Sequence, residues 1–477
     1  MKNKKQVCLS VLIYISVFQP SILLSQNLKM IGVRIWDSEK KSFGVLSDIE
    51  IQKGLVKSIQ PSTKTQTETV RYLLPGFCDA SVTLGSDALG GEISKDALPF
   101  HLQSFLATGF SHVESVSDPD LQNLKDEISK ARLVGPIISQ SQKPILLQSH
   151  FGSGDAPTKQ YNLKDINHPT FLKDADPSRS KHLPIFLKRA SQEMFSQADL
   201  FQLREEAQKN GYTPIVYSFA DPNSWEDALD AGYQVLFHSL PPNAHLEAIQ
   251  RRSFVWAPML NITYLQSMKV DPTLLGSKVK SYAKFHPVFQ EKFLESFLLS
   301  IGEGEASPQS KKMADQFESL YSSLDGFPQD RLIFASGSGH FGSYPGLGAI
   351  IEADLWLKRW KLHLLPESQT NRESESTSFW QKLWGSFQRT YSIRKVNQDP
   401  ETINQNQRDL ITVLTQNTCL FIKADHEGRI RLGGPAHFSV HKRNPFVQPL
   451  GIFAIESMVL GGKLVYTPKP EKVGKKP

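Results

Sequence analysis

Cysteine is scarce in this sequence, with three residues, at positions 8, 78 and 419, in a chain of 477. Two of them lie beyond the N-terminal segment, which is too few for a disulfide framework. We predict that Cys78 and Cys419 are buried as small hydrophobic side chains. The sequence also lacks HExxH, CxxC, GxSxG, a P-loop motif and a GxGxxG that follows a strand. The function therefore cannot be inferred from any of these short motifs.

Residues 1–25 differ from the rest of the chain. Lys2, Lys4 and Lys5 precede an apolar run from Val7 to Leu24. This pattern is typical of a secretory signal peptide, and we predict cleavage after Ser25 and export to the periplasm, the cell surface or the medium. An uncleaved membrane anchor is the alternative, because the apolar run approaches the length that spans a bilayer.

The sequence also lacks a large excess of either positive or negative charge. Residues 1–25 contain three lysines and no acidic residue, so the remainder carries 51 basic and 48 acidic side chains. This balance is not that of a nucleic-acid-binding protein, and we expect neither nucleic acid nor a stable membrane span after cleavage. The basic tail at 471–477 is expected to be a solvated end.

Both ends of the remaining chain are rich in short predicted strands. Alternating apolar residues predict strands at 30–36 and 49–59, with a turn at Lys53-Gly54. Further strands are predicted at 428–432, 437–440 and 458–466, with Gly-Gly turns at 433–434 and 461–462.

The middle of the chain alternates helices and strands instead. Residues 196–211 have the apolar spacing of a helix, and a strand at 213–217 follows. A helix from Ser224 then leads to a strand at 233–237, with His238 at its end. Helices that connect successive strands in this way indicate parallel pairing, and over some 350 residues the pattern favours an α/β fold with a (β/α)₈ barrel.

Two polar stretches are predicted to be insertions in this barrel, near 152–182 and 367–409. The second has a helical stripe of aromatic residues that includes Trp380 and Trp384. We expect this stripe to pack on the barrel, with contacts to a partner protein as the alternative.

A resemblance to a known family comes from several segments in their sequence order. LPGFCDASVTLG at 74–85 resembles the first-strand signature of the metal-dependent amidohydrolase superfamily, in its imidazolonepropionase/prolidase-like branch. Four further segments resemble the opening and closing parts of the family's pattern. They are GVRIWD (32–37) and KGLVKSI (53–59) near the start, and GRIRLGGPAHFSVHKRNPF (428–446) and VLGGKLVYTP (459–468) near the end. His437 stands in place of an aspartate in the third of them. The resemblance implies a barrel at 75–427 and a small composite β-sandwich domain from 26–74 and 428–470.

The family binds zinc or another divalent metal through side chains at the strand ends. The His-x-His positions hold Ser81 and Thr83 here, and Lys188 holds that of the bridging lysine. The fifth-strand histidine is replaced by Tyr217, the sixth is retained as His238, and the eighth-strand aspartate is replaced by Ser338. Hydroxyl groups do not substitute for imidazole and carboxylate ligands, so the resemblance implies a degenerate site without a metal cofactor.

We therefore expect an exported pseudoenzyme that lacks metal-dependent hydrolysis and is retained as a binding or structural protein. Its barrel mouth would suit a polar or anionic small molecule. Asp79 is expected to have a structural role at the strand-end turn.

The alternative is an atypical hydrolase of carbon–nitrogen bonds with a rebuilt site. Such a site could draw on His238, Lys188 and His340, or on ligands outside the signature such as His150 and Glu114. A pair of Ser338 with His238 or His340 and a Schiff-base Lys188 are further variants of this alternative. We expect His238 to be part of a hydrogen-bond network rather than a lone metal ligand.

Overall fold

The fold is described from a computed structural model of the chain. The described residues are 27–63, 70–86, 93, 96–116, 118, 121–147, 159–160, 176, 178–187, 197–218, 224–238, 252–268, 276–277, 280, 317, 324, 327–339, 343–362, 400–448 and 450–468.

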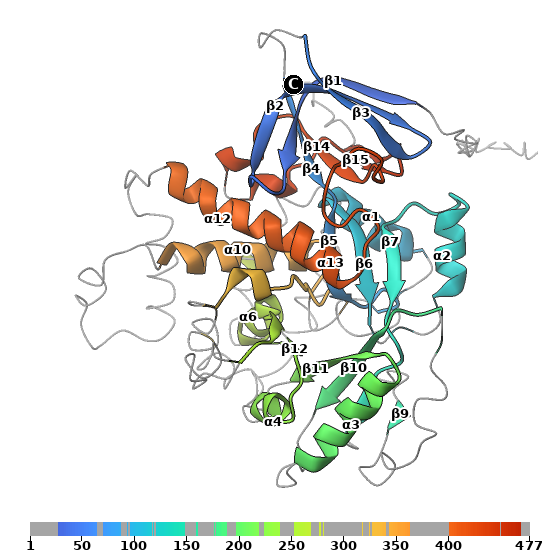
Figure 1. Cartoon of the computed structure of the whole chain (residues 1–477), viewed down its shortest axis with the longest axis vertical. Coiled ribbons are helices and arrows are strands. Elements are labelled where there is room, and N and C mark those ends of the chain that lie inside the picture. The colour runs from blue at the N-terminus through green and yellow to red at the C-terminus, as the bar shows by residue number, and fades with distance from the viewer. Residues whose placement is uncertain are drawn as a thin grey trace, which may run out of the picture.

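A seven-stranded sheet joins the two ends of the chain. Its order is β16-β15-β14-β4-β1-β2-β3, and β4 lies parallel to β1 and antiparallel to β14. Figure 1 shows the early strands beside the late ones at one end of the molecule. The strands are β1 (Leu28–Asp37), β2 (Ser42–Gln52), β3 (Leu55–Pro61), β4 (Arg71–Pro75), β14 (Phe438–His441), β15 (Ser457–Leu460) and β16 (Lys463–Tyr466).

Alternation of side chains explains why these residues form a sheet. In β2, Ile49 and Ile51 are fully buried while their neighbours are partly exposed, as expected for a strand with one face on a core. Val33 of β1 and Phe438 of β14 belong to the same cluster, so residues from both chain ends share this core.

One predicted strand of this region is wrong. Residues 428–432 form turns and irregular structure. Glu427 and Gly428 both have positive φ, 50° and 67°, which breaks the extended backbone that the apolar residues at 430 and 432 suggested. The glycine pair at 461–462 does form the predicted turn, between β15 and β16.

Parallel strands form the second region. One sheet has the order β5-β6-β7 and another the order β13-β12-β11-β10-β8-β9, and every pair in them is parallel. The first contains β5 (Phe77–Val82), β6 (Phe110–Ser115) and β7 (Ile137–Gln140). The second contains β8 (Ile145–Leu147), β9 (Lys159–Gln160), β10 (His182–Leu187), β11 (Thr213–Ser218), β12 (Val235–Phe237) and β13 (Val255–Ala257).

Helices connect and cover these strands (Figure 1). They are α1 (Leu98–Ala107), α2 (Gln122–Ser129), α3 (Gln197–Lys209), α4 (Ser224–Asp230), α6 (Leu260–Met268), α10 (Leu347–Leu362), α12 (Pro400–Thr412) and α13 (Thr418–Phe421). The predicted helix at 196–211 is confirmed as α3, which buries Leu200, Leu203 and Ala207. The fold is therefore α/β, as predicted.

Among the described residues the two parallel sheets do not join into one closed sheet. Residues 332–338 lie between them, with parallel bridges from Leu332 to Trp256 and from Ser338 to Val82. The amide of Ile333 donates to the carbonyl of Trp256 at 2.9 Å, and that of Ala80 donates to the carbonyl of Phe334 at 3.0 Å. This segment therefore lies between β13 and β5.

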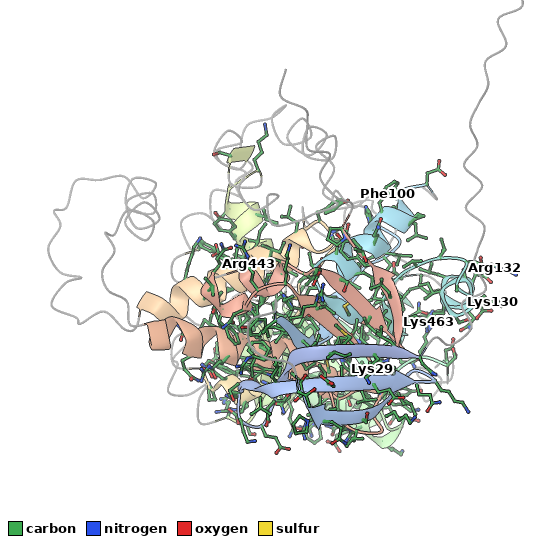
Figure 2. All side chains as sticks on the ribbon, turned by 90° about the horizontal axis from the view of Figure 1, so that it is seen from above. Lys29, Phe100, Lys130, Arg132, Arg443 and Lys463 are labelled. Carbon is green, nitrogen blue, oxygen red and sulfur yellow. A yellow bond between two sulfur atoms is a disulfide. The ribbon has the colours of Figure 1, made fainter. Side chains whose placement is uncertain are left out.

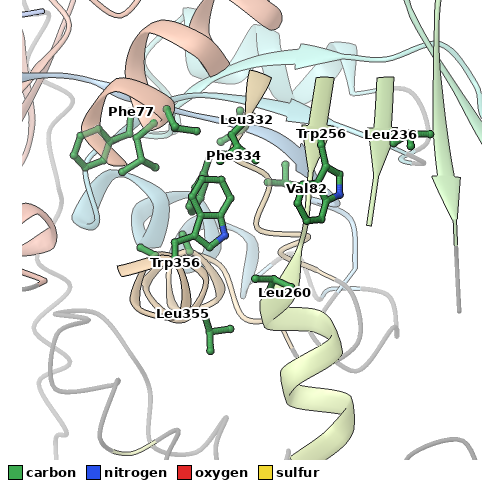
Figure 3. Packing of buried hydrophobic residues seen from close by; sticks show 14 of the residues in the cluster. Phe77, Val82, Leu236, Trp256, Leu260, Leu332, Phe334, Leu355 and Trp356 are labelled. Carbon is green, nitrogen blue, oxygen red and sulfur yellow. The ribbon is translucent and has the colours of Figure 1, made fainter. Parts of the chain in front are cut away.

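Large aromatic residues fill the space between the parallel strands and the helices. Trp356 of α10 packs on Phe334, with ring centroids 5.8 Å apart, and Figure 3 shows both beside Phe77 and Trp256. All four side chains are fully buried. Basic residues such as Lys29, Lys130 and Arg132 lie instead on the exposed surface, spread over different parts of it (Figure 2).

The cysteine prediction is half wrong. Cys78 and Cys419 are both fully buried, but they form a disulfide, with Cα atoms 5.3 Å apart. Burial was foreseeable from the apolar neighbours in sequence. Pairing was not, because it depends on α13 being brought against the start of β5 by the fold.

Several predicted features lie outside the described residues: the leader at 1–25, the tail at 471–477, and Trp380 with Trp384. Of the two predicted insertions, the first is described only at 159–160, 176 and 178–182, and the end of the second, from Pro400, belongs to α12. Within the described part of the chain, no helix has the length and apolar character needed to cross a membrane.

The disulfide predicts a large contribution to stability. It joins residues 341 positions apart, so it restricts the unfolded chain strongly. We expect the Cys78→Ala/Cys419→Ala double variant to lose about 2–4 kcal/mol in the free energy of unfolding, measured by urea denaturation without reductant. Reductant should lower the wild-type midpoint to that of the variant and leave the variant unchanged. Equal midpoints before reduction would contradict the prediction.

Candidate functional site at the strand ends

Five of the six positions that resemble family metal ligands are described, and they lie at the carboxyl ends of the parallel strands. Ser81 lies near the end of β5 and Thr83 directly after it, Tyr217 lies near the end of β11, and His238 follows β12. Ser338 is bridged to Val82. All five side chains are buried. The carboxyl ends of strands are where α/β barrels carry their active sites.

The Asp79 carboxyl connects β5 to the segment at 332–338 by hydrogen bonds. Its Oδ1 accepts hydrogen bonds from the amide of Ser336 at 2.9 Å and from that of Ser81 at 3.2 Å. Its Oδ2 accepts from the Ser336 hydroxyl, which also lies 2.6 Å from the Ser338 Oγ. Complete burial raises the pKa of Asp79 to about 7, although the hydrogen bonds oppose the shift.

The hydroxyl groups at the strand ends bond to one another or to backbone. Tyr217 donates its hydroxyl to Ser81 Oγ at 3.2 Å, and its ring contacts those of Phe186 and Phe237. Thr83 Oγ1 donates to the carbonyl of Val116 at 2.9 Å. Burial raises the pKa of Tyr217 well above its usual value, so this group stays a neutral phenol.

His238 has an unusual backbone conformation. Its φ is +102°, in a region that favours glycine, and it is held there by two hydrogen bonds. Its amide donates to the carbonyl of Ala257 at 2.8 Å, and its carbonyl accepts from Trp256 Nε1 at 2.8 Å. Burial lowers the pKa of the imidazole to about 4, so the side chain is neutral at pH 7. Backbone strain of this kind concentrates at functional sites.

At the family's ligand positions that the structure describes, four of the five side chains are hydroxyls, which are poor zinc ligands. Hydroxyls of Ser81, Tyr217 and Ser338 are neutral and engaged with one another or with Ser336, whereas zinc takes thiolate, imidazole or carboxylate ligands. His238 is the one imidazole among the described residues at these positions. Lys188, His340 and His150 lie outside the described residues.

Glu114, the remaining alternative ligand, already has partners. It is buried on β6 and accepts hydrogen bonds from Ser180 Oγ at 2.5 Å and from His182 Nδ1 at 2.6 Å. The structure therefore joins Glu114 to the start of β10, and no group of three metal-ligating side chains in the described residues includes it.

A polar cluster at the other ends of the strands was not predicted from the sequence. It contains His112, near the start of β6, Asp425 and His426, after α13, and His437, before β14. Two hydrogen bonds, the stronger effect from His112 and the weaker from His437, hold the pKa of Asp425 well below its usual range. The one available signal was His437, which replaces an aspartate in the family pattern.

No protein-family model and no curated protein matches the sequence. Several solved structures, however, are similar to this chain. A prolidase complexed with N-methylphosphonate-L-proline has a TM-score of 0.59 at 13% identity, and the match covers 93% of this chain and 100% of the other. An amidohydrolase has a TM-score of 0.59 at 13% identity, covering 94% and 100%. The A. niger ochratoxinase has a TM-score of 0.56 at 12% identity, covering 93% and 96%.

These likenesses extend over nearly the whole chain, and at such low identity they show the fold. The chain therefore has the fold of the amidohydrolase superfamily, as the sequence predicted. Prolidase-like proteins are among the structures that it resembles.

Asp79 predicts a specific pH dependence of stability. Its pKa is about 7 in the folded protein, against an ordinary value of 3.8 for an aspartate in water. Its contribution to stability is therefore complete below about pH 4 and is lost as the pH rises through about 7. Between about pH 5 and pH 8, wild type should lose about 2–3 kcal/mol more stability than Asp79→Asn, which cannot ionise.

Urea unfolding at both pH values measures this difference. Asp330→Asn, at an exposed position, is the matched control and should follow wild type. Parallel pH profiles for wild type and Asp79→Asn would show that the carboxyl is already ionised in the fold.

Proposed function

We propose that this chain is a member of the amidohydrolase superfamily whose strand-end site has lost metal-dependent hydrolysis. On this proposal the protein is a pseudoenzyme, retained as a binding or structural protein. The observation that carries the proposal is the hydrogen bond from Tyr217 to Ser81, which links two former ligand positions through neutral hydroxyls. A phenol that remains protonated cannot supply the anionic or imidazole ligand that a hydrolytic metal needs.

The finer architecture belongs to the same proposal. Parallel bridges on both sides of residues 332–338 support a closed eight-stranded barrel. The mixed composition of the seven-stranded sheet supports a composite β-sandwich domain. In such a barrel, a ligand at the mouth would meet hydroxyl groups and the neutral His238, a set suited to a polar or anionic small molecule.

Export is also proposed. The leader pattern at 1–25 motivates it, and the Cys78–Cys419 disulfide supports it, because such bonds form and persist in oxidising compartments. Location in the periplasm, at the surface or in the medium would then follow from the organism's envelope.

One observation favours the alternative of an atypical hydrolase. The Ser338 hydroxyl is connected through Ser336 to a buried carboxyl, Asp79, whose pKa lies near 7. A carboxylate in this position could take a proton from Ser338 through the intervening hydroxyl and so favour attack on an amide carbonyl.

Hydrolysis assays separate these functions. Wild type, His238→Ala and Ser338→Ala would be incubated with Xaa-Pro dipeptides and N-acyl amino acids, with zinc, manganese or iron added. We expect equal, background-level product release from all three proteins, because His238 is the one metal-ligating side chain among the family's ligand positions that the structure describes. Turnover that falls at least about tenfold in His238→Ala would overturn the proposal, and a loss confined to Ser338→Ala would establish the alternative.

A further inference from the structure

The cluster around Asp425 lies between the parallel strands and the seven-stranded sheet. His112 comes from β6, His437 directly precedes β14, and Asp425 lies in the turn after α13. Three separate parts of the fold thus each contribute one side chain. The cluster is at the amino ends of β5 and β6, away from the strand ends where the family pattern places its ligands.

Potential ligand atoms converge there. One atom each from His112, Asp425 and His437 lie within 4.8 Å of one another. The His112 Nε2 is 3.1 Å from Asp425 Oδ1, and the His437 Nε2 is 3.2 Å from Asp425 Oδ2. These are hydrogen-bond distances to the two oxygens of one carboxylate, and they are also close to the roughly 3.3 Å between ligand atoms about 2.0–2.1 Å from a tetrahedral zinc ion, so a small shift would bring the three ligands onto one ion.

The rings are oriented so that two of the imidazoles can share an ion. His112 and His437 are nearly perpendicular, at 80°, with centroids 5.3 Å apart. Their in-plane lone pairs can therefore approach one point from different directions. His426 is stacked on His112 at 14°, so the lone pairs of these two rings run side by side and do not converge.

His426 nevertheless contributes an unsatisfied acceptor. Its Nε2 lies 2.9 Å from the carbonyl of Gly76, to which it donates, so its Nδ1 carries a lone pair. That Nδ1 is buried, has no hydrogen-bond partner among the described residues and lies 3.8 Å from Asp425 Oδ1. A buried acceptor without a partner is unfavourable, because it has lost its hydrogen bonds to water. A water molecule on a cation at Asp425 could donate to it.

The site is open to solvent on one side. The Asp425 side chain is 54% exposed, while those of His112 and His437 are 7% and 5% exposed. An ion can therefore enter at the carboxylate and meet imidazoles that are already held in place by packing. Ligand atoms that are already close together and a path from solvent both favour metal binding.

We propose that His112, Asp425 and His437 bind a divalent transition-metal ion such as zinc. Two imidazole nitrogens and one carboxylate oxygen suit zinc and its neighbours better than magnesium or calcium, which prefer all-oxygen sets. Cys78 lies close to His112 and His426, but its sulfur is bonded to Cys419 and is not a thiolate ligand. The ion would join β6, the turn at 425 and the seven-stranded sheet.

Binding requires one local adjustment. The amide of Gly461 donates to His437 Nδ1 at 3.0 Å, which places the ring proton on Nε2, toward Asp425. A metal at Nε2 displaces that proton, and Nδ1 then becomes a donor. Gly461 and Gly462 both have positive φ, in the turn between β15 and β16, and this turn is where the protein would respond.

Zinc titration of the purified full chain tests the proposal. We expect about one zinc ion per chain by elemental mass spectrometry after removal of free metal, and binding at least about 100-fold weaker in Asp425→Asn and in His437→Gln. Loss of an outer partner alone costs about 10–100-fold, so loss of a direct ligand should exceed that range. Cobalt in place of zinc should give a visible spectrum without a thiolate charge-transfer band.

His238→Ala is the matched control and should bind zinc as wild type does. Absence of zinc binding by folded wild type, or binding that survives both Asp425→Asn and His437→Gln, would overturn the proposal. A thermal unfolding curve recorded without metal shows whether each variant is folded, and the half-exposed Asp425 makes its variant the safer of the two. Binding lost in His238→Ala but kept in Asp425→Asn would place the metal at the strand ends instead.

Discussion

The buried carboxyl of Asp79 connects β5, the earliest of the parallel strands in the sequence, to the segment at 332–338, which follows the last of them. Through Ser81 and Ser336 it connects β5 to the segment at 332–338, which is the connection that any closed barrel would need. Such a carboxyl could not be solvated by water, so protein hydrogen bonds must satisfy it. Both strand ends are thereby fixed in register, and the hydroxyls of Ser81 and Ser338 are fixed with them.

The two ends of the parallel strands differ in chemistry. At the carboxyl ends the described side chains are mainly hydroxyls that satisfy one another, with His238 held neutral by burial. At the amino ends three imidazoles surround one carboxylate. Among the described residues, the imidazole-rich cluster therefore lies on the side that faces the seven-stranded sheet, opposite to where the family pattern places its ligands.

Sequence reasoning predicted the α/β class, the helix at 196–211 and the amidohydrolase fold, because these depend on periodicity and on motifs in order along the chain. It also placed His238 directly after a strand. It could not find the disulfide or the cluster at Asp425, since Cys78 and Cys419, or His112 and His437, are far apart in sequence and only the fold brings them together. The strand predicted at 428–432 failed because positive φ at residues 427 and 428 overrode an apolar pattern.

The position of β4 has a consequence for synthesis of the chain. It lies between β1 and β14 in the sheet, and its hydrogen bonds to β14 await residues near the end of the chain. While the polypeptide is still growing, one side of β4 is an unpaired edge with free amide and carbonyl groups, which can pair with another chain. Nearly the entire polypeptide must therefore be synthesised before this edge can be covered, and any chaperone that binds the unfolded protein would have this strand to shield.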